Sequence, residues 1–385
     1  MQIEYLGTFG IIFGVLARFW PVWIALAVIL LFSTSFRERL GLYGQLFETG
    51  VGVAGVMICF FWLFTAIFAG TVAPFDPLAQ FPIMKNVLPG AIEPESGQAF
   101  LFGGDRLARD VFSRMVYGSQ IVLIIAPAAT LFALMVGTTL GLPAGYYGGR
   151  IDSFLSFLAN LVLAFPVILL FYLLVTPGIR ETPIPQWMAG VFFIFPIVFF
   201  VTLFWTRFRS RPQLLAIQLA LTLLIGGWAY VGLVFDADPL GIISISSNQL
   251  NIFVAVVFAS SPGVFRIVRG LVMDIKTRDY VAAAQTRGET PWYIMLWEVL
   301  PNARGPLIVD VCLRIGYTTI LLGTLGYFGL GLAPESPDWG TGIKESSRLL
   351  RAYVHPALPP VFALMSFVLG LNLLADALRE QSLKD

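Results

Sequence analysis

Charged residues are scarce in this chain of 385 residues. Only 12% are Asp, Glu, Lys or Arg, whereas a soluble globular protein typically contains about 25%. Apolar residues make up 57%, and the mean hydropathy is +0.82. A single soluble core of this length could not hide that much apolar surface. The composition therefore indicates an integral membrane protein.

Histidine, cysteine and surplus basic charge are also nearly absent. The one histidine is His355, and the two cysteines, Cys59 and Cys312, lie in apolar runs, so the sequence indicates no disulfide framework, metal cluster or catalytic triad. A net charge of +1 argues against a nucleic-acid-binding surface. The chain contains no Gly-Lys dipeptide and hence no Walker A loop. We therefore expect no catalytic residues, no metal site and no cofactor in this chain.

Long apolar runs are abundant instead. A membrane-crossing helix needs about 20 mostly apolar residues, and membrane-crossing strands would be shorter and would alternate in polarity. Eight runs satisfy the helical requirement: Val51–Ala73, Gln120–Gly141, Phe154–Val175, Met188–Trp205, Leu214–Val234, Asn251–Val268, Leu307–Phe328 and Leu358–Leu378. The sequence thus predicts an all-α membrane protein with eight or nine transmembrane helices.

The ninth apolar stretch, Gly10–Phe32, leaves alternatives open. It contains Arg18 and Pro21, and its uninterrupted part is short for a span. A cleaved signal peptide would need a better cleavage site than Ser33-Thr34-Ser35 and a basic residue near its start, which this sequence lacks. We favour a retained N-terminal membrane helix, either spanning the membrane or lying in its interface.

Basic residues gather in alternate connections between the apolar runs. They are Arg37 and Arg39, Arg150, Arg207, Arg209 and Arg211, the five in 269–305, and Arg379 with Lys384. If all of these connections are cytoplasmic, the eight spans alternate without conflict. The opposite side then receives 74–119, 176–187, 236–250 and 329–357.

The connection 269–305 contains signals for two short helices. Thr277 is expected to cap an Ala-rich helix over 278–287, and Gly288 suits the left-handed residue that ends a helix. Thr290 and Pro291 then begin a second helix, Trp292–Leu300, which Pro301 is expected to stop.

The second helix has one apolar side, formed by Trp292, Met295, Leu296 and Val299. We expect the two short helices either to form a knob that fits a partner's cleft or to be an ordinary amphipathic connector.

This connection resembles the EAA loop of ABC-importer permeases. The family pattern is Glu-Ala-Ala, three residues, Gly, nine residues, Ile, any residue, Leu-Pro, and Ala283, Ala284, Gly288 and Leu300-Pro301 fall in register with it. The resemblance implies an ATPase-coupling loop. Its candidate residues are Asp279, Tyr280, Ala283, Ala284, Gly288, Leu300, Pro301 and Asn302.

Three further blocks resemble the dipeptide/oligopeptide/nickel branch of that family, in the C type of its two permeases. They are Gly104–Gly118, Gly145–Gly149 with Leu163–Pro166, and Leu325–Pro334 with Ser336–Gly340 and Asn372–Arg379. All lie in family order. Taken alone, Gly145–Gly149 would be a plain turn and Gly104–Gly118 a surface amphipathic segment.

The sequence also departs from the family pattern. Ala282 replaces the glutamate of the loop, Glu298 its isoleucine, and Phe157 and Asn160 an Arg-x-x-Asp pair. Extra residues within 176–250 hold the Met188 and Leu214 spans, which predicts an added helical hairpin at the periphery, facing lipid.

The resemblance divides the chain into three parts. Residues 1–50 would be an N-terminal membrane helix and cytoplasmic linker, 51–119 the first family span and an external segment, and 120–385 the permease core with the inserted pair and the EAA-type loop 269–305.

Asp310 and Arg314 are the main charges inside an apolar run. They are four residues apart and share a helix face. Ionisable residues at membrane depth usually face the interior of a bundle or a cavity. The pair therefore either lines a translocation path or neutralises itself against another helix.

The resemblance implies a subunit of an ATP-driven importer in a bacterial cytoplasmic (inner) membrane. A second homologous permease would complete the path, two ATPase subunits would bind ATP and Mg, and an extracytoplasmic binding protein would deliver peptides or similar small solutes. A secondary transporter or channel independent of ATPases is the main alternative, although it usually shows internal repeats or broken helices around charged sites. A membrane enzyme would need a catalytic set that the sequence lacks.

Overall fold

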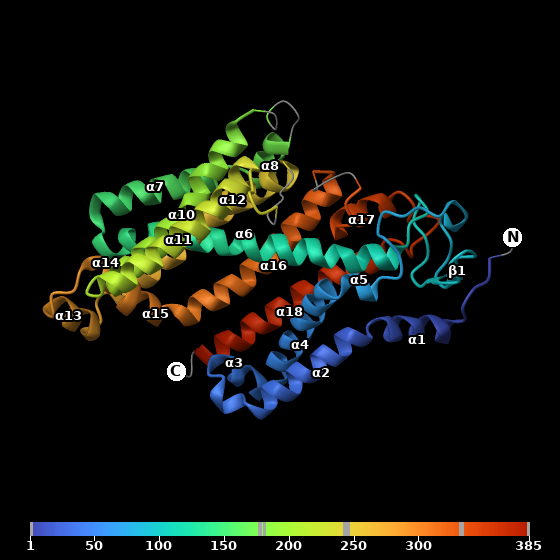
Figure 1. The fold of residues 1–385 in the computed structure, drawn as a ribbon, viewed down its shortest axis with the longest axis horizontal. Coiled ribbons are helices and arrows are strands. Elements are labelled where there is room, and N and C mark those ends of the chain that lie inside the picture. Colours follow the sequence, from blue (N-terminus) through green and yellow to red (C-terminus); the bar gives the residue numbers. More distant parts are fainter. Residues whose placement is uncertain (1–2, 176–178, 180–181, 242–246, 331–334, 383–385) are drawn as a thin grey trace. The chain divides into compact units, whose positions relative to one another are not determined.

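The computed structural model describes residues 3–175, 179, 182–241, 247–330 and 335–382, and most of them are helical (Figure 1). The chain forms two compact units. The first comprises Met1–Pro127 and Ile315–Asp385, and the second Ala128–Arg314. The two boundaries fall inside the long helices α6 (Val111–Tyr147) and α16 (Arg304–Phe328).

In its described residues, the first unit contains seven further α-helices, three short 3₁₀ turns and one small antiparallel hairpin. The helices are α1 (Thr8–Arg18), α2 (Trp20–Ser35), α3 (Leu42–Gln45), α4 (Gly50–Ile67), α5 (Ala69–Val72), α17 (Trp339–Ser347) and α18 (Leu358–Ser382), of which α3 and α5 are single turns. The 3₁₀ turns are Arg37–Arg39, Leu46–Glu48 and Pro82–Met84, and the strands are β1 (Ala91–Ile92) and β2 (Ala99–Phe100), paired Ala91 to Phe100 and Ile92 to Ala99.

The second unit is built from helices in its described part. They are α7 (Gly149–Ala164), α8 (Val167–Val175), α10 (Ile184–Phe208), α11 (Pro212–Phe235), α12 (Ser247–Ile275), α13 (Asp279–Thr286), α14 (Pro291–Tyr293), a π-helical turn (Ile294–Val299) and α15 (Leu300–Asn302).

In the described residues, seven helices are long and apolar enough to cross a membrane, or up to nine if each of two bent pairs is one span. This confirms the predicted all-α membrane architecture. One bent pair is α1 with α2, which meet at an angle of 56°. Phe19, Val22 and Leu26 of this pair are buried in the core of the first unit, so the N-terminal stretch packs against the rest of that unit.

The predicted span Phe154–Val175 is not one continuous helix. The structure divides it into α7 and α8, which are bent by 77°. Phe165 between them is extended, with φ −83° and ψ 129°, as expected for the residue before Pro166. The run Gln120–Gly141 is, in contrast, part of the 37-residue helix α6. At 1.5 Å per residue α6 is about 55 Å long, so the whole of it cannot lie within about 30 Å of hydrocarbon.

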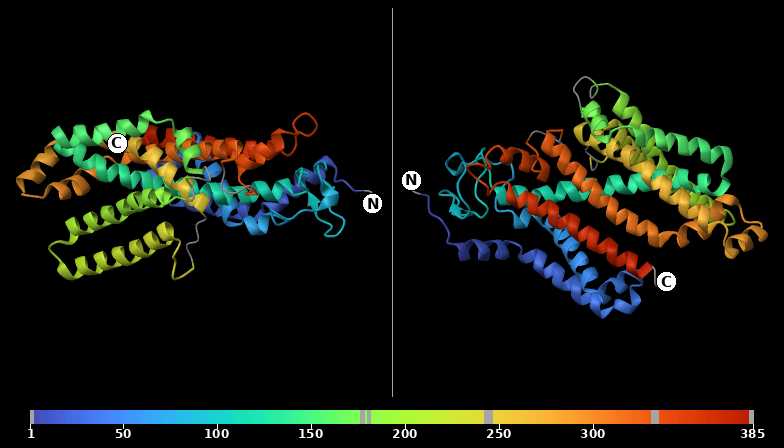
Figure 2. Two further views of the ribbon diagram at one scale, coloured as in Figure 1. Left: turned by 90° about the horizontal axis from the view of Figure 1, so that it is seen from above. Right: turned by 180° about the vertical axis from the view of Figure 1, so that it is seen from behind.

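The predicted added hairpin region forms two long helices, α10 and α11. They run side by side and antiparallel, joined by a short turn (Figure 2). Tyr230 donates a hydrogen bond to the Gly190 carbonyl at 3.2 Å, and Gln186 donates one to the Val234 carbonyl at 3.1 Å. In the most apolar window of α11 no residue is buried, and in that of α10 only 11% of the residues are buried. That exposure is what a lipid-facing hairpin requires; the lipid-facing placement stays a prediction.

Candidate functional site

The first helix that lies wholly within the EAA-type loop, residues 269–305, is α13. Arg278 precedes it in an extended conformation, and no side chain caps the helix. The prediction that Thr277 caps it is wrong, because the Thr277 hydroxyl instead donates to the Asp274 carbonyl at the end of α12, at 2.8 Å. Asp279 in the first turn is favourably placed for the helix dipole.

Gly288 ends α13 as the sequence predicts. Its φ is +77°, and a Cβ there would meet nothing within 4 Å, so the demand for glycine is conformational rather than steric. The Gly288 amide donates to the Gln285 carbonyl at 2.9 Å and the Glu289 amide to the Ala284 carbonyl at 3.3 Å. These two bonds form a Schellman motif, which fixes the direction in which the chain leaves the helix.

The second half of the loop starts as predicted but does not stop where predicted. Thr290 accepts a hydrogen bond from the Tyr293 amide, and Pro291 occupies the first helical position. Pro301, however, does not end the helix: the Ala303 amide bonds to the Val299 carbonyl at 3.1 Å, so the ladder continues past it. The π-helical turn Ile294–Val299 ends two residues before Pro301. A wider turn provides room for the proline ring and tolerates its missing N–H.

The apolar side of this second half faces the chain's own core. Met295, Leu296 and Val299 are buried and Trp292 is partly buried. They pack with a cluster that includes Leu142, Val264, Val268 and Val272. This side is therefore not available to a partner's cleft, because residues of the same unit already fill the space around it. Docking of the loop through its outer surface stays a prediction.

What remains open to a partner is the outer surface of α13 and the turn after it. Asp279, Tyr280, Ala283, Gly288, Pro301 and Asn302 are exposed, Leu300 is half-buried and Ala284 is buried. The eight candidate coupling residues thus separate into an exposed set and a smaller set that attaches the loop.

The Gly145–Gly149 block lies against this loop. The Lys276 ammonium donates to the Gly145 and Tyr146 carbonyls at 2.8 and 3.2 Å, at the C-terminal end of α6, where a cation is favourable. Gln285 of α13 donates to the Tyr146 hydroxyl at 3.2 Å. Gly148 and Gly149 both have positive φ, +67° and +57°. The block is a turn, and it also contacts the segment before α13, through Lys276, and the last turn of α13, through Gln285.

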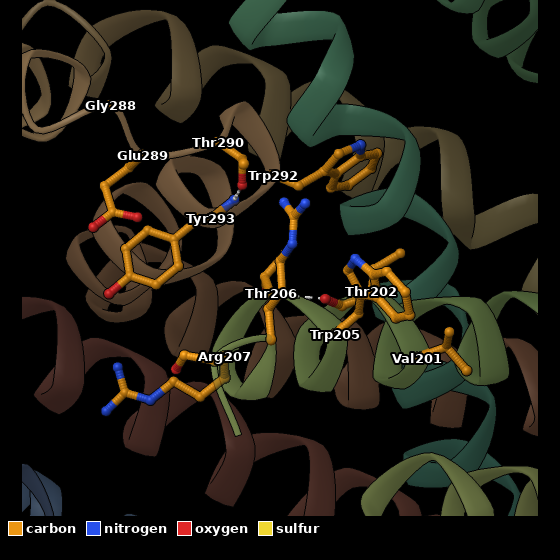
Figure 3. Close-up of a pocket in the computed structure, with 12 residues that line it drawn as sticks. Val201, Thr202, Trp205, Thr206, Arg207, Gly288, Glu289, Thr290, Trp292 and Tyr293 are labelled. Atoms are coloured by element: carbon orange, nitrogen blue, oxygen red, sulfur yellow. Dashed lines mark hydrogen bonds between the residues drawn. The ribbon is translucent and has the colours of Figure 1, made fainter. Parts of the chain in front are cut away.

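The α10–α11 hairpin supplies a contact to the loop that sequence reasoning missed. The Trp297 indole N–H donates to the Thr206 hydroxyl at 3.1 Å, and the Arg207 guanidinium lies 4.7 Å from the centre of the Trp297 ring. A pocket of about 700 Å³ lies beside this contact, lined by α10 on one side and by Gly288–Tyr293 on the other (Figure 3). The only signal for this contact in the sequence was that the connection 207–211, like the loop, is basic and was predicted to be cytoplasmic.

A buried ion cluster forms in the first unit from two other family blocks. Arg109 donates to Asp105 at 2.7 Å and to Glu345 at 2.5 Å, and its own side chain is only 2% exposed. Arg114 lies 3.9 Å from Asp105 and 3.5 Å from Glu345. The segment Gly104–Gly118 is therefore not a surface amphipathic segment, because Asp105, Arg109 and Arg114 are buried and paired inside the unit, although Arg106 is exposed.

Trp339 joins the same two blocks. Its indole N–H donates to the Met115 carbonyl at 2.9 Å, and a Cβ on Gly118 would lie 2.5 Å from its ring. Asp338 caps α17 by accepting from the Thr341 amide and hydroxyl. These contacts give the block Ser336–Gly340 a structural role. The preceding segment Gly331–Pro334 lies outside the described residues.

Asp110 and His355 both have shifted pKa values. Complete burial raises the pKa of Asp110 to about 6, although hydrogen bonds from the Ser113 hydroxyl and amide lower it. Burial lowers the pKa of His355 below its usual 6.5. The described residues contain no group of three His, Cys, Asp or Glu side chains that could hold a metal ion.

The Asp310–Arg314 pair forms as its spacing predicts. Arg314 donates to Asp310 at 2.5 Å, and the two side chains are 16% and 13% exposed. Arg314 also donates to the Ser260 carbonyl of α12 at 3.3 Å, and a Cβ on Gly263 would lie 2.8 Å from its guanidinium. The pair is thus neutralised and packed on α12, with a small part of each side chain accessible.

Helices α7 and α12 are also joined by polar contacts. Arg269 pairs with Asp152, and Arg266 donates to the Asn160 amide oxygen at 2.6 Å. Asn160, which departs from the family's aspartate, therefore still acts as an acceptor. Phe157, in the place of the family's arginine, is exposed.

The fold and loop define an α-helical membrane permease subunit that carries an EAA-type loop. The family described as binding-protein-dependent transport system inner membrane component matches residues 137–382, and the chain belongs to this family. It is therefore a multi-pass protein of the inner membrane and a transport component rather than an enzyme. The resemblance to peptide ABC-importer permeases is confirmed, and a secondary transporter or channel is not supported.

Relatives extend the similarity over most of the chain. The di/tripeptide transport system permease protein DppC of Pseudomonas aeruginosa (strain UCBPP-PA14) is 28% identical over 330 residues, 85% of this chain and 86% of the relative. The dipeptide transport system permease protein DppC of Haemophilus influenzae is 28% identical over 316 residues, 82% and 84% of the two chains. The glutathione transport system permease protein GsiD of Pectobacterium atrosepticum is 26% identical over 330 residues, 86% and 85%.

Proposed function

We propose that this chain is one of two permeases in an ATP-driven importer of short peptides. The names of its relatives support this substrate class, since they refer to dipeptides, tripeptides and glutathione, which is itself a tripeptide. A second, homologous permease completes the translocation path, and an extracytoplasmic binding protein delivers the peptide. ATP and Mg bind to two partner ATPase subunits, not to this chain.

The coupling surface is the exposed side of α13 with the Gly288 turn. The observation that carries this assignment is the division within the loop: its apolar side is buried in its own unit, while Asp279, Tyr280, Ala283 and Gly288 stay exposed. Because the exposed surface of the loop rests on a buried, packed apolar side, a force applied to that surface is transmitted to the bundle without deforming the loop. Movement of the ATPases is thereby passed to the bundle, which alternates access as rigid bodies.

A matched pair of glycine variants tests this assignment. Gly288 and Gly270 both have open space where a Cβ would be added, but only Gly288 has positive φ. Gly288→Val should leave the chain in the membrane while substrate-stimulated ATP hydrolysis falls to the basal rate, because a β-branched residue resists that conformation. Gly270→Val should keep its stimulation. Normal stimulation and uptake in Gly288→Val would contradict the assignment.

We further propose that Asp310 and Arg314 face the translocation path. Six and ten residues after the start of α16, they lie about 9 and 15 Å along it. A charge that faced hydrocarbon near mid-membrane would cost about 2.5–3.5 kcal/mol. The accessible part of the pair therefore belongs beside protein or water.

Three variants distinguish this placement from a structural role. If the pair lines the path, Asp310→Asn should change the uptake rate or the peptide preference at normal complex yield. A structural pair would behave differently, because removing one partner strands the other charge. Loss of yield in Asp310→Asn and in Arg314→Gln, with recovery of both yield and uptake in the double variant, would refute the path assignment.

The substrate class has its own test. The complex should be purified with its partners, and the binding protein titrated with dipeptides, tripeptides, glutathione, nickel and sugars. Selective binding of the peptides is the expected result. Selective binding of nickel or a sugar would refute the peptide assignment while leaving the coupling assignment intact.

A further inference from the structure

The α10–α11 hairpin is attached to the EAA-type loop through α10 at the loop's second half. Phe199 and Leu203 pack against the core cluster beneath the loop. One turn further along, the Thr206 hydroxyl accepts from the Trp297 indole at 3.1 Å, and Arg207 lies over the same ring at 4.7 Å. Apolar, hydrogen-bonding and cation–π contacts from one helix thus converge on one side of the loop.

The hydroxyl of Thr206 is oriented for this contact. It donates its hydrogen to its own helix, at the Thr202 or Leu203 carbonyl, both 2.9 Å away. Its lone pair is therefore the part left for the indole, and the acceptor is held in place before the loop meets it. The guanidinium of Arg207 adds attraction to the face of the same indole, where Trp is the best aromatic partner for a cation.

Trp297 occupies a mechanically sensitive position. It lies within the π-helical turn Ile294–Val299, just before Pro301. Such turns frequently occur at functional sites, and this one joins the loop to α16 through a continuous ladder, with the Leu307 amide bonded to the Ala303 carbonyl at 3.2 Å. The neighbouring pocket of about 700 Å³ is lined by residues of α10 and of Gly288–Tyr293, and α10 also contacts α14. The hairpin therefore contacts the second half of the loop, and its polar contact there is with Trp297.

We propose that the α10–α11 hairpin is a brace for the coupling loop, and that the contact of Thr206 and Arg207 with Trp297 sets how much ATP hydrolysis rises when substrate is delivered. This inference rests on the proposed coupling function of the loop and adds its regulation. Thr206, Arg207 and Trp297 act as positioning residues, since none of them belongs to the exposed coupling surface.

The test measures the ratio of substrate-stimulated to basal ATP hydrolysis in the full complex in lipid nanodiscs. Thr206→Val removes the acceptor but keeps the branched shape, and Trp297→Phe removes the N–H donor but keeps an aromatic ring. A net hydrogen bond of ordinary strength changes an equilibrium about two- to tenfold, so each variant should lower the ratio by about that factor. The double variant should lower it no further than the stronger single variant, and Arg207→Gln should also lower it.

Two further variants separate a positioning role from a structural one. Thr206→Ser keeps the hydroxyl and should keep the wild-type ratio. Thr202→Val removes a hydroxyl that lines the same pocket but bonds only within its own helix, so it should be silent. Complex yield and melting temperature should match the wild type in every variant.

The outcomes distinguish this proposal from the function on which it rests. Wild-type ratios in Thr206→Val, Trp297→Phe and Arg207→Gln, beside an uncoupled Gly288→Val, would overturn the brace alone. A wild-type ratio in Gly288→Val would overturn the coupling assignment, and the brace with it. A fall in the ratio that only accompanies lower yield or melting temperature would also overturn the brace, because it would show a structural contact.

Discussion

Arg109→Gln should loosen the segment 81–110 and α17 in the first unit. The Arg109 side chain is 2% exposed and balances Asp105 and Glu345, whose side chains are 8% and 15% exposed. Removing one partner from a buried ion pair typically costs about 3–5 kcal/mol, because an uncompensated charge stays behind. Arg114 lies within 3.9 Å of both carboxylates and offsets part of this, so we expect the lower end of the range.

Hydrogen exchange of the purified complex measures the effect directly. At about 1.4 kcal/mol per factor of ten, a cost near 3 kcal/mol corresponds to exchange roughly a hundredfold faster in the peptides of this segment and of α17. Arg106→Gln is the matched control, since Arg106 lies in the same loop but is exposed. Equal protection in the Arg109 and Arg106 variants would refute the energetic reading of the cluster. Glu345→Gln added to Arg109→Gln should cost less than the sum of the two, because one stranded charge is removed.

Three further predictions concern other parts of the chain. Because the pKa of Asp110 is raised from 3.8 to about 6, stability should fall as pH rises between those values and level off above 6. The free energy of unfolding should therefore be about 1 kcal/mol larger at pH 5 than at pH 7.5. Asp110→Asn should lose that difference. Gly340→Ala should lower the melting temperature, since its Cβ would lie 2.2 Å from the Gly323 carbonyl oxygen, whereas Gly342→Ala should not, because its Cβ meets only ordinary contacts; equal melting temperatures would contradict this. Ser210→Cys, without the native cysteines, should react with an impermeant thiol reagent only from the cytoplasmic side, and labelling from outside would overturn the topology.

Local chemistry made part of this structure predictable. Hydropathy located every long helix, since crossing a membrane requires an apolar run of fixed length. The Gly288 turn and the start of the second loop helix at Thr290–Pro291 depend on the conformations open to single residues. Both could therefore be predicted from the sequence. The break at Pro166 was also readable from the proline rule, but the apolar run around it hid the signal.

Long-range partners were not predictable in the same way. An apolar stripe at Met295 and Val299 indicates that one side of a helix is buried, but it does not identify what covers that side. Burial against a partner protein and burial against the chain's own core predict the same sequence pattern. The ion pair of Arg109 with Glu345 joins residues 236 positions apart, and nothing in either segment names the other. The Trp297–Thr206 contact joins the loop to the α10–α11 hairpin, which lies outside the four blocks that carry the resemblance, so the resemblance could not supply it.

The unequal burial of the two hairpin helices has a consequence for how this region tolerates change. Helix α11 contacts mainly α10, and no residue in its most apolar window is buried. Away from the side that faces α10, its positions require only an apolar, helix-forming residue, so many sequences would serve. The inner side of α10 must instead fit Trp297 and the core beneath it. Random mutagenesis of residues 184–235 should therefore show unequal tolerance of substitution. Apolar residues should replace one another freely along α11, whereas functional variants should carry only a few residue types at Thr206 and Arg207.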